Sequence, residues 1–259
     1  MVSEIMLQQT QVDRVIPKYN AFLNRFPTAK RLAEASPAEV ITLWSGLGYN
    51  RRAIYLHRAA QQIVTQKSFP TSTIGLTELA GIGPYTASAI LAFAYHQDVP
   101  VVDTNIRRIF SRYFFNGKGT LSGIEQQVGS SVPRGKGTDW NNALMDFGSM
   151  ICMADQPACS VCVLRKTCTA FQQGNTQHYL RIAPPQSKFE GSRRQIRGRV
   201  LKLLKDASNG GLSFTQFAHQ LEKPIPLISE IISEMKKEGL TTVRSARVSL
   251  PQKKTLDNR

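Results

Sequence analysis

Four cysteines crowded into one short stretch constrain this chain more than any other feature. They are its only cysteines, and they fall within 17 of 259 residues with the spacing C-x6-C-x2-C-x5-C: Cys152, Cys159, Cys162 and Cys168. Disulfides are a poor interpretation, because nothing in the chain indicates export to an oxidising compartment. Four thiolates at short spacing indicate a metal site, and the spacing suits both a tetrahedral zinc ion and a [4Fe–4S] cluster.

The charge balance favours a polyanionic partner. Lys and Arg number 33 against 18 Asp and Glu, which gives a formal net charge of +15 and a pI of about 10.0. Such a chain attracts nucleic acid, since its cations neutralise phosphates and release counterions; a merely basic surface is the alternative. No apolar run reaches the about 18 residues of a membrane span, and the early acids Glu4 and Asp13 do not suit a secretory signal. We therefore expect a cytoplasmic, nucleoid-associated protein with no membrane partner.

Residues 1–180 have the hydrophobic periodicity of helices and almost no strand-like alternation. Apolar side chains between Val12 and Leu23 recur at the i, i+3, i+4 and i+7 positions of an amphipathic helix. Short breaks rich in Gly, Pro and Ser separate the other periodic segments. The sequence therefore predicts an all-α region, with further helices over residues 31–35, 38–44, 52–65, 85–94, 106–113 and 140–150.

A second, smaller domain is predicted beyond this region. A stretch rich in Pro, Gly and Ser at residues 181–192 indicates a linker. Three helices and a β-ribbon outline a winged-helix-like domain over residues 193–249, and a basic tail follows at 250–259. Residues 186–259 carry +8 of the net charge, so we expect this part to lie on DNA phosphates. The expected helices are 193–205, 214–221 and 226–239, and the expected strands are 241–243 and 247–249.

The segment LAGIGPYTA, from Leu79 to Ala87, joins two helical stretches. Its two glycines, Gly81 and Gly83, allow a tight turn, and Pro84 suits the first turn of the following helix. The exposed N–H groups at that helix start would face an anion such as a phosphate. These features are typical of a helix-hairpin-helix, and a plain turn without a ligand is the alternative.

Two acids occupy positions with both a structural and a chemical explanation. Glu4 opens a helix, where the helix dipole stabilises a carboxylate, and Asp103 precedes a helical stretch, as an N-cap does. Two carboxylates in different environments can also divide the proton-donating and charge-stabilising roles that cleavage of a glycosidic bond requires. The two explanations do not exclude each other.

Together these segments resemble the MutY-type adenine DNA glycosylases, iron–sulfur members of the helix-hairpin-helix DNA glycosylase superfamily that are related to endonuclease III. The resemblance covers residues 1–180. It implies a six-helix barrel over about residues 8–105 and a cluster domain made of residues 106–180 with the N-terminal residues. In that family the cysteines hold a [4Fe–4S] cluster, which favours iron–sulfur over zinc. The matching motifs are SEIMLQQTQ at 3–11, GLGY at 46–49, the hairpin at 79–87, VDTN at 102–105 and the four cysteines.

The resemblance implies roles for single residues. Glu4 matches the acid that protonates the departing adenine, and Asp103 matches the carboxylate that stabilises the sugar cation. Tyr85 occupies the position of the lysine nucleophile in bifunctional relatives, and Asn105 matches a polar active-site residue near that aspartate. The implied DNA contacts are Gln9 and Tyr49, which wedge into the duplex, and Gly81, Gly83 and Thr86 of the hairpin.

The implied activity is that of a monofunctional hydrolase, acting as a monomer, that removes adenine mispaired with 8-oxoguanine or guanine in double-stranded DNA. The family recognises 8-oxoguanine with a Nudix-like domain. In this sequence the basic winged-helix-like segment occupies the corresponding position. The resemblance therefore does not decide which base opposite the adenine is preferred. Three alternatives stay open. They are a thymine or uracil mismatch glycosylase, which Glu4 disfavours; a non-catalytic DNA-binding iron–sulfur protein; and an endonuclease III-type lyase, which Tyr85 disfavours.

Overall fold

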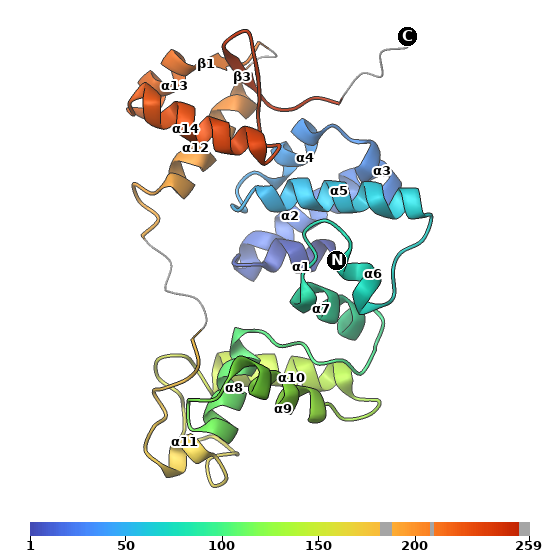
Figure 1. Ribbon diagram of the computed structural model, residues 1–259, viewed down its shortest axis with the longest axis vertical. Coiled ribbons are helices and arrows are strands. Elements are labelled where there is room, and N and C mark those ends of the chain that lie inside the picture. Colours follow the sequence, from blue (N-terminus) through green and yellow to red (C-terminus); the bar gives the residue numbers. More distant parts are fainter. Residues whose placement is uncertain (182–187, 208–209, 254–259) are drawn as a thin grey trace. The chain divides into compact units, whose positions relative to one another are not determined.

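A computed structural model describes residues 1–181, 188–207 and 210–253. Contacts group the chain into two compact units, each of which is described by itself (Figure 1). Unit 1 comprises Met1–Pro70, Glu78–Gly81 and Gln186–Arg259, and unit 2 comprises Thr71–Thr77 and Ile82–Pro185. Among the described residues, no helix is long and apolar enough to cross a membrane.

Unit 1 contains two groups of helices and one small sheet. Its helices begin at local sequence signals: Ser36 caps α4 by accepting the Glu39 N–H, and Pro37 fits the first helical position. The first group is α1 (Val2–Leu7), α2 (Val12–Arg25), α3 (Ala29–Glu34), α4 (Pro37–Trp44) and α5 (Arg51–Gln66). The second group is α12 (Arg193–Asp206), α13 (Phe214–Leu221) and α14 (Ile225–Lys237), with strands β1 (Leu212–Ser213), β2 (Thr242–Arg244) and β3 (Arg247–Ser249).

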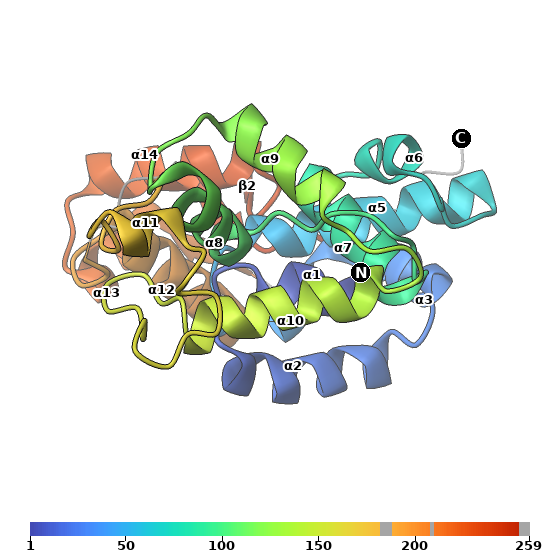
Figure 2. The same cartoon turned by 90° about the horizontal axis from the view of Figure 1, so that it is seen from below.

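Helices are the only regular secondary structure among the described residues of unit 2. Its core is formed by α8, whose Ile109 and Phe110 pack with Val128 of α9 and Leu144 of α10. Figure 2 shows α8 running beside α11, on which it also packs. The helices are α6 (Thr73–Thr77), α7 (Pro84–Ala94), α8 (Thr104–Phe115), α9 (Leu121–Ser130), α10 (Gly137–Met150) and α11 (Thr169–Gln172).

The predicted all-α region is confirmed, with helix boundaries that move by one to three residues. The sequence did not predict α6, α9 or α11. The helix α9 contains two glycines and buries only Ile124 and Val128, so its apolar stripe is too sparse to recognise. Its start is fixed instead by Thr120, whose hydroxyl accepts the Gly123 N–H at 3.1 Å.

The winged-helix-like outline of the C-terminal segment is also observed. The element order is helix, strand, helix, helix, strand, strand, and β3 lies between β1 and β2 in an antiparallel sheet. Val248 of β3 is paired with Leu212 on one side and Val243 on the other. Ser245 and Ala246 adopt positive φ in the turn between β2 and β3, as a tight hairpin requires. Strand β1 was not predicted, because two residues are too few to show alternation.

One hydrophobic core joins these C-terminal elements to α4 and α5. Ile41 of α4 and Ile54 of α5 belong to the same buried cluster as Phe217, Met235 and Val248. The C-terminal segment therefore does not have a hydrophobic core of its own. Its apolar side chains share one core with α4 and α5 in unit 1.

The C-terminal domain extends past its predicted end at residue 249. Leu250 and Pro251 are buried, and the Pro251 carbonyl accepts a hydrogen bond from the Ala38 N–H at 2.8 Å. Of the predicted linker and basic tail, residues 182–187 and 254–259 lie outside the described residues.

The boundaries of the two contact-defined units differ from the predicted boundaries of the barrel and the cluster domain. Residues 82–105 group with the cysteines in unit 2, and the N-terminal residues group with unit 1. The reason lies in α7, whose Ala89 and Ala92 pack with Met145 of α10. The barrel and the cluster domain stay predictions.

Candidate active site

Glu4 lies in the first turn of α1, next to the buried Ile5 and Met6. Burial raises the pKa of the Glu4 carboxyl. A carboxyl with a raised pKa keeps its proton closer to neutral pH, which suits a general acid. These surroundings are compatible with the proton-donating role that the resemblance implies for Glu4. They are also compatible with the structural explanation, in which the carboxylate interacts with the helix dipole of α1.

Arg52 of α5 holds the segment that follows Glu4, and the sequence analysis did not single it out. Its side chain is 9% exposed, and burial lowers the pKa of its guanidinium to about 10. It donates hydrogen bonds to α1, to the turn after α1 and to the loop between α4 and α5, and it stacks 5.4 Å from the Trp44 ring. The acceptors are the carbonyl oxygens of Ile5 (2.5 Å), Met6 (3.1 Å), Gln8 (2.7 Å), Leu47 (3.5 Å) and Gly48 (3.2 Å), and the Thr10 hydroxyl (3.1 Å).

The signal that could have found Arg52 is its place on the apolar stripe of α5. It lies at helical spacing from the buried Leu56 and Ile63, where a charged residue is unusual unless it is paired. Within the described part of the chain Arg52 forms no ion pair with a carboxylate. Its partners are backbone oxygens, which a sequence pattern does not reveal.

We expect Arg52→Lys to lower the free energy of unfolding by about 2–4 kcal/mol. A single ammonium group cannot reach the acceptors in and after α1 and those in the loop between α4 and α5 at the same time, so buried carbonyl groups lose their donors. Urea unfolding followed by circular dichroism measures this loss. The matched control is Arg51→Lys at the exposed neighbouring residue, which should change stability by no more than about 0.5 kcal/mol. Equal stability of the two variants would contradict the bracing role of Arg52.

Gln9 and Tyr49, the predicted wedge residues, share an unusual backbone conformation. Their φ angles are 55° and 46°, in the left-handed region that non-glycine residues rarely adopt. Tyr49 ends a sharp turn in which Gly46 and Gly48 also have positive φ, and 40% of its side chain is exposed. The guanidinium of Arg52 lies 5.5 Å from the Tyr49 ring. Strain of this kind, held in place by a rigid support, is typical of functional loops.

The predicted hairpin is present, and Gly81 is required in it. Its φ is 77°, and a Cβ at this position would lie 2.6 Å from the Tyr55 Cβ. Gly83 is the N-cap of α7 and Pro84 follows it at the first helical position. Thr86 is only 3% exposed, so its side chain lies inside unit 2, and a phosphate contact there would have to use its backbone N–H. Tyr85, the second residue of α7, is partly buried.

Asp103 is the N-cap of α8, as the ordinary structural interpretation predicted. Its Oδ1 accepts the Ile106 N–H at 2.7 Å, and its Oδ2 accepts the Asn105 side-chain amide at 3.0 Å. Burial raises the pKa of Asp103, and the hydrogen bonds oppose that rise. The cap therefore fixes the orientation of a desolvated carboxylate, which is what electrostatic stabilisation of a cation needs.

Asn105 continues this hydrogen-bond chain toward the cysteines. Its Oδ1 accepts a hydrogen bond from Arg108 Nη2 at 2.8 Å, and Arg108 Nε donates to the Cys152 carbonyl at 2.8 Å. The helices α8 and α10 approach closely here, since a Cβ at Gly148 would lie 2.6 Å from the Asn105 Cβ. The structure thus brings Asp103, Asn105 and the first cysteine into one connected part of unit 2.

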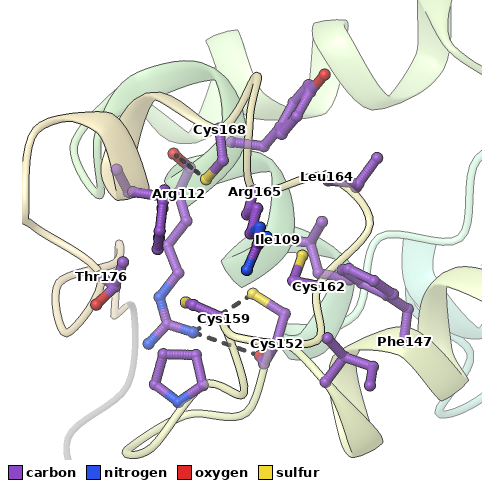
Figure 3. Close-up of a pocket in the computed structure, with 15 residues that line it drawn as sticks. Ile109, Arg112, Phe147, Cys152, Cys159, Cys162, Leu164, Arg165, Cys168 and Thr176 are labelled. Carbon is purple, nitrogen blue, oxygen red and sulfur yellow. Dashed lines mark hydrogen bonds between the residues drawn. The ribbon is translucent and has the colours of Figure 1, made fainter.

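All four cysteines line one cavity of unit 2 (Figure 3). Their thiols are half-buried and free of disulfides. Arg112 borders the cavity: its Nη1 lies 3.5 Å from the Cys152 Sγ, and its carbonyl accepts a weak hydrogen bond from the Cys168 Sγ at 3.7 Å. Burial, and next the proximity of the other three sulfurs, raises the pKa of Cys159.

Four thiols that line one cavity have the donor chemistry of an iron–sulfur centre, and the Arg112 guanidinium beside them would balance its negative charge. Their side chains do not converge on one point in this structure. Within the described residues, no three His, Cys, Asp or Glu side chains are arranged to hold a metal ion.

Comparison with known proteins identifies close relatives. The family described as HhH-GPD superfamily base excision DNA repair protein matches residues 2–134. An adenine DNA glycosylase of Mycolicibacterium smegmatis is 37% identical over 216 residues, covering 80% of this chain and 72% of that protein. An adenine DNA glycosylase of Buchnera aphidicola subsp. Baizongia pistaciae is 39% identical over 176 residues, covering 66% of this chain and 50% of that protein.

Solved structures agree on the fold. A thermostable thymine-DNA glycosylase superposes with a TM-score of 0.63 at 26% identity, covering 66% of this chain and 82% of that one. An endonuclease III in a non-covalent DNA complex superposes with a TM-score of 0.61 at 18% identity, covering 67% of this chain and 83% of that one. The predicted helix-hairpin-helix glycosylase fold is thereby confirmed.

Proposed function

The chain belongs to the HhH-GPD superfamily of base excision DNA repair proteins, and from this membership we propose that it is an adenine DNA glycosylase. It hydrolyses the N-glycosidic bond that joins adenine to deoxyribose in double-stranded DNA. The observation that carries the proposal is the 37% identity to the Mycolicibacterium smegmatis adenine DNA glycosylase over 72% of that protein. We propose that the protein acts as a monomer on the DNA of the cytoplasmic nucleoid.

Two carboxyl groups divide the chemistry in this proposal. The enzyme turns the adenine nucleotide out of the duplex, since the bond is not accessible within the stack. Glu4 donates a proton to the adenine ring, and the bonding electrons leave with the base as the C1′–N9 bond breaks. The Asp103 carboxylate stabilises the positive charge that develops on the sugar. Water then adds to C1′ and loses a proton, which leaves an abasic site.

Tyr85 makes the reaction monofunctional in this proposal. A lysine at this position could attack C1′ and form a Schiff base, whereas a phenol cannot. Water is therefore the nucleophile, and strand breakage requires a later chemical or enzymatic step.

We propose 8-oxoguanine or guanine as the base opposite the adenine. The test uses the purified chain on three duplexes, with A opposite 8-oxoguanine, A opposite G and T opposite G, each treated with alkali after incubation. Alkali-dependent cleavage at adenine, without a borohydride-trapped covalent adduct, is the expected result. A trapped adduct in the wild type would contradict the monofunctional mechanism.

A thymine mismatch glycosylase is the second candidate function. It is favoured by the likeness to the thermostable thymine-DNA glycosylase, the solved structure with 26% identity. Glu4 disfavours it, because loss of thymine does not call for the same acid. Cleavage of the T:G duplex with none at adenine would select this candidate.

We also propose that the four cysteines hold a [4Fe–4S] cluster, with one thiolate ligand for each iron. The cavity that all four line and the Arg112 guanidinium beside Cys152 support this ligand set. When bound, the cluster would link the four cysteines of residues 152–168 and would fix the backbone conformation of this segment.

Anaerobically purified protein is expected to be brown, to absorb broadly in the visible range and to contain about four irons per chain. Cys159→Ser should lose the colour and most of the iron, whereas Ser160→Ala in the same loop should keep both. Colourless protein with one zinc per chain would contradict the cluster and favour the zinc alternative.

The pH profile of the single-turnover rate of adenine release is expected to be bell-shaped. The active form has Asp103 ionised and Glu4 protonated, and burial raises the pKa of both. Activity should therefore fall at low pH as Asp103 takes up a proton, and fall at higher pH as Glu4 loses its proton. Single-turnover rates on the A:8-oxoguanine duplex measure the profile. A flat alkaline limb in the wild type would contradict the role of Glu4.

A further inference from the structure

The C-terminal segment of unit 1 contacts the turn that presents Tyr49. We call residues 46–49 the Tyr49 loop. Nη1 of Arg194, in the first turn of α12, lies 3.1 Å from the Tyr49 hydroxyl. Figure 1 shows α12 beginning beside the loop that joins α4 to α5, as this contact requires. A segment remote in sequence thus places a guanidinium at the exposed edge of this ring.

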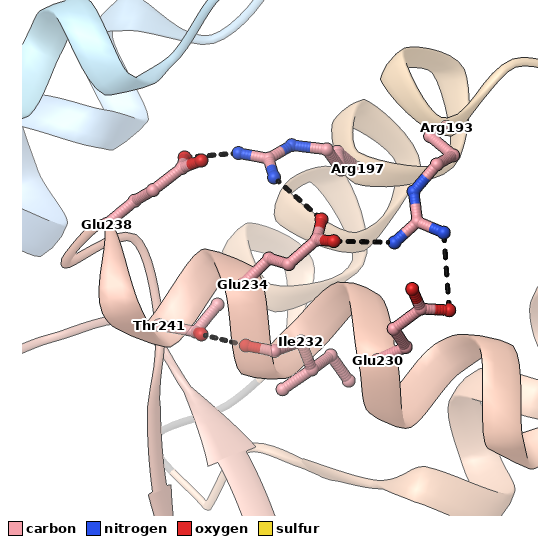
Figure 4. A network of polar contacts seen from close by, with 7 residues as sticks. All are labelled: Arg193, Arg197, Glu230, Ile232, Glu234, Glu238 and Thr241. Atoms are coloured by element: carbon pink, nitrogen blue, oxygen red, sulfur yellow. Dashed lines mark hydrogen bonds and ion pairs between the residues drawn. The ribbon is translucent and has the colours of Figure 1, made fainter.

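The arginines of α12 differ in their partners. Arg193 and Arg197 pair with three glutamates, two within α14 and one at its C-cap (Figure 4). Arg193 lies 3.3 Å from Glu230 and 2.8 Å from Glu234, and Arg197 lies 3.6 Å from Glu234 and also pairs with Glu238. Their charges are therefore balanced within the domain. Arg194 donates a hydrogen bond to the Tyr49 hydroxyl and so borders the Tyr49 loop.

Two more cations surround the same loop from α2. Arg14 donates a hydrogen bond to the Gly46 carbonyl. Lys18 is close as well, since a Cβ at Gly46 would lie 3.6 Å from its Cε and 3.9 Å from its Nζ. Neither Arg14 nor Lys18 forms an ion pair with a carboxylate within the described ranges.

An exposed aromatic ring bordered by such cations has the chemistry of a nucleic-acid contact. A base stacks on the ring, a contribution of about 1–3 kcal/mol by alanine substitution. Guanidinium and ammonium groups at its rim bind the phosphates on either side, and arginine can do so with two parallel hydrogen bonds.

We propose, on the basis of the proposed glycosylase function, that Arg194 and the Tyr49 loop form one DNA-contacting surface, in which Arg194, Arg14 and Lys18 bind phosphates of the strand that Tyr49 enters. The C-terminal domain then meets DNA through the start of α12. Helix α14 contributes no cation to this surface: its Glu230 and Glu234, and Glu238 at its C-cap, are paired with Arg193 and Arg197 of α12.

The test compares two arginines of one helix in the full-length chain. Arg194→Ala and Arg199→Ala each remove one positive charge from α12, but the partner of Arg199 is the Gln220 carbonyl rather than the Tyr49 hydroxyl. Fluorescence anisotropy measures the Kd of each variant for a duplex with a non-cleavable adenosine analogue opposite 8-oxoguanine, over a series of salt concentrations. We expect Arg194→Ala to raise the Kd about 5–10-fold and to reduce the salt slope by about 1, and Arg199→Ala to stay within about twofold of wild type.

A purely structural role for Arg194 gives a different pattern. Arg194→Lys keeps the charge and should restore most of the affinity, and Arg194→Ala should leave Tm within about 2 °C of wild type. Equal Kd values for Arg194→Ala and Arg199→Ala would overturn the inference. So would a lower Tm in Arg194→Ala together with no rescue by lysine, because Arg194 would then only dock the domain.

Failure of this inference is distinguishable from failure of the proposed function. Wild-type protein that releases no adenine from the A:8-oxoguanine duplex would refute the glycosylase activity, while the binding comparison still decides the role of Arg194. Wild-type protein that releases adenine, with equal Kd values for the two variants, would refute the inference alone.

Discussion

Replacing Asp103 with asparagine is expected to slow adenine release by about 10²–10³-fold, the loss typical of a preorganised electrostatic contact. The variant keeps the shape of the side chain and one oxygen that can accept the Ile106 N–H, so α8 should keep its cap. What disappears is the negative charge that faces the sugar cation in the transition state, together with the hydrogen bond that the Asn105 amide donates to Oδ2. Single-turnover rates at saturating enzyme measure the effect without a contribution from binding.

Asp98 offers a matched control for this substitution. It is also a carboxylate of unit 2 that accepts backbone hydrogen bonds, from Gly135 at 2.6 Å and Gly137 at 2.9 Å. Asp98→Asn makes the same chemical change and should leave the single-turnover rate within about twofold of wild type, since any loss should appear in stability. Equal rate losses in the two variants would show that Asp103 matters only as a helix cap.

Replacing Glu4 with glutamine is expected to slow release by about 10²–10⁴-fold, the range that general acid catalysis contributes. Glutamine fills the same space and can donate a hydrogen bond, but it cannot transfer a proton to the leaving base. The defect should shrink on a duplex whose target base leaves without protonation. The variant should also lose the alkaline limb of the pH profile, because glutamine does not titrate.

The control for Glu4 is Glu34→Gln, on the exposed end of α3, where Glu34 forms a 4.0 Å ion pair with Lys30. That variant should retain the wild-type rate, since an exposed pair of this kind contributes little. Full activity in Glu4→Gln would exclude the adenine mechanism and favour a thymine mismatch activity.

The helices were predictable wherever an apolar stripe has to face a core. Residues 52–65 show this best, because their buried positions recur at helical spacing and the observed α5 extends the prediction by one residue at each end. The short helix α6 and strand β1 were not predictable, since they contain too few residues for periodicity to appear. Whether such short elements form depends on tertiary contacts and not on the local sequence pattern.

The sequence singled out the candidate site residues but could not give their arrangement. The cysteine spacing predicts a metal site, which stays a prediction, and all four cysteines line one cavity. The bracing by Arg52 was not foreseen, because its partners are backbone oxygens of segments far away in sequence. The burial of the Thr86 side chain was missed for a related reason: a hairpin motif predicts exposed N–H groups but does not say which side chains turn inward.

The shared core of α4, α5 and the C-terminal helices has a consequence for the order of folding during synthesis. Ile41 and Ile54 leave the ribosome more than 160 residues before their core partners Phe217, Met235 and Val248. Unit 2 is encoded between them and can fold while the apolar faces of α4 and α5 still wait for their partners. A nascent chain that stalls before residue 250 therefore displays an uncovered apolar surface, which marks it for chaperones and proteases.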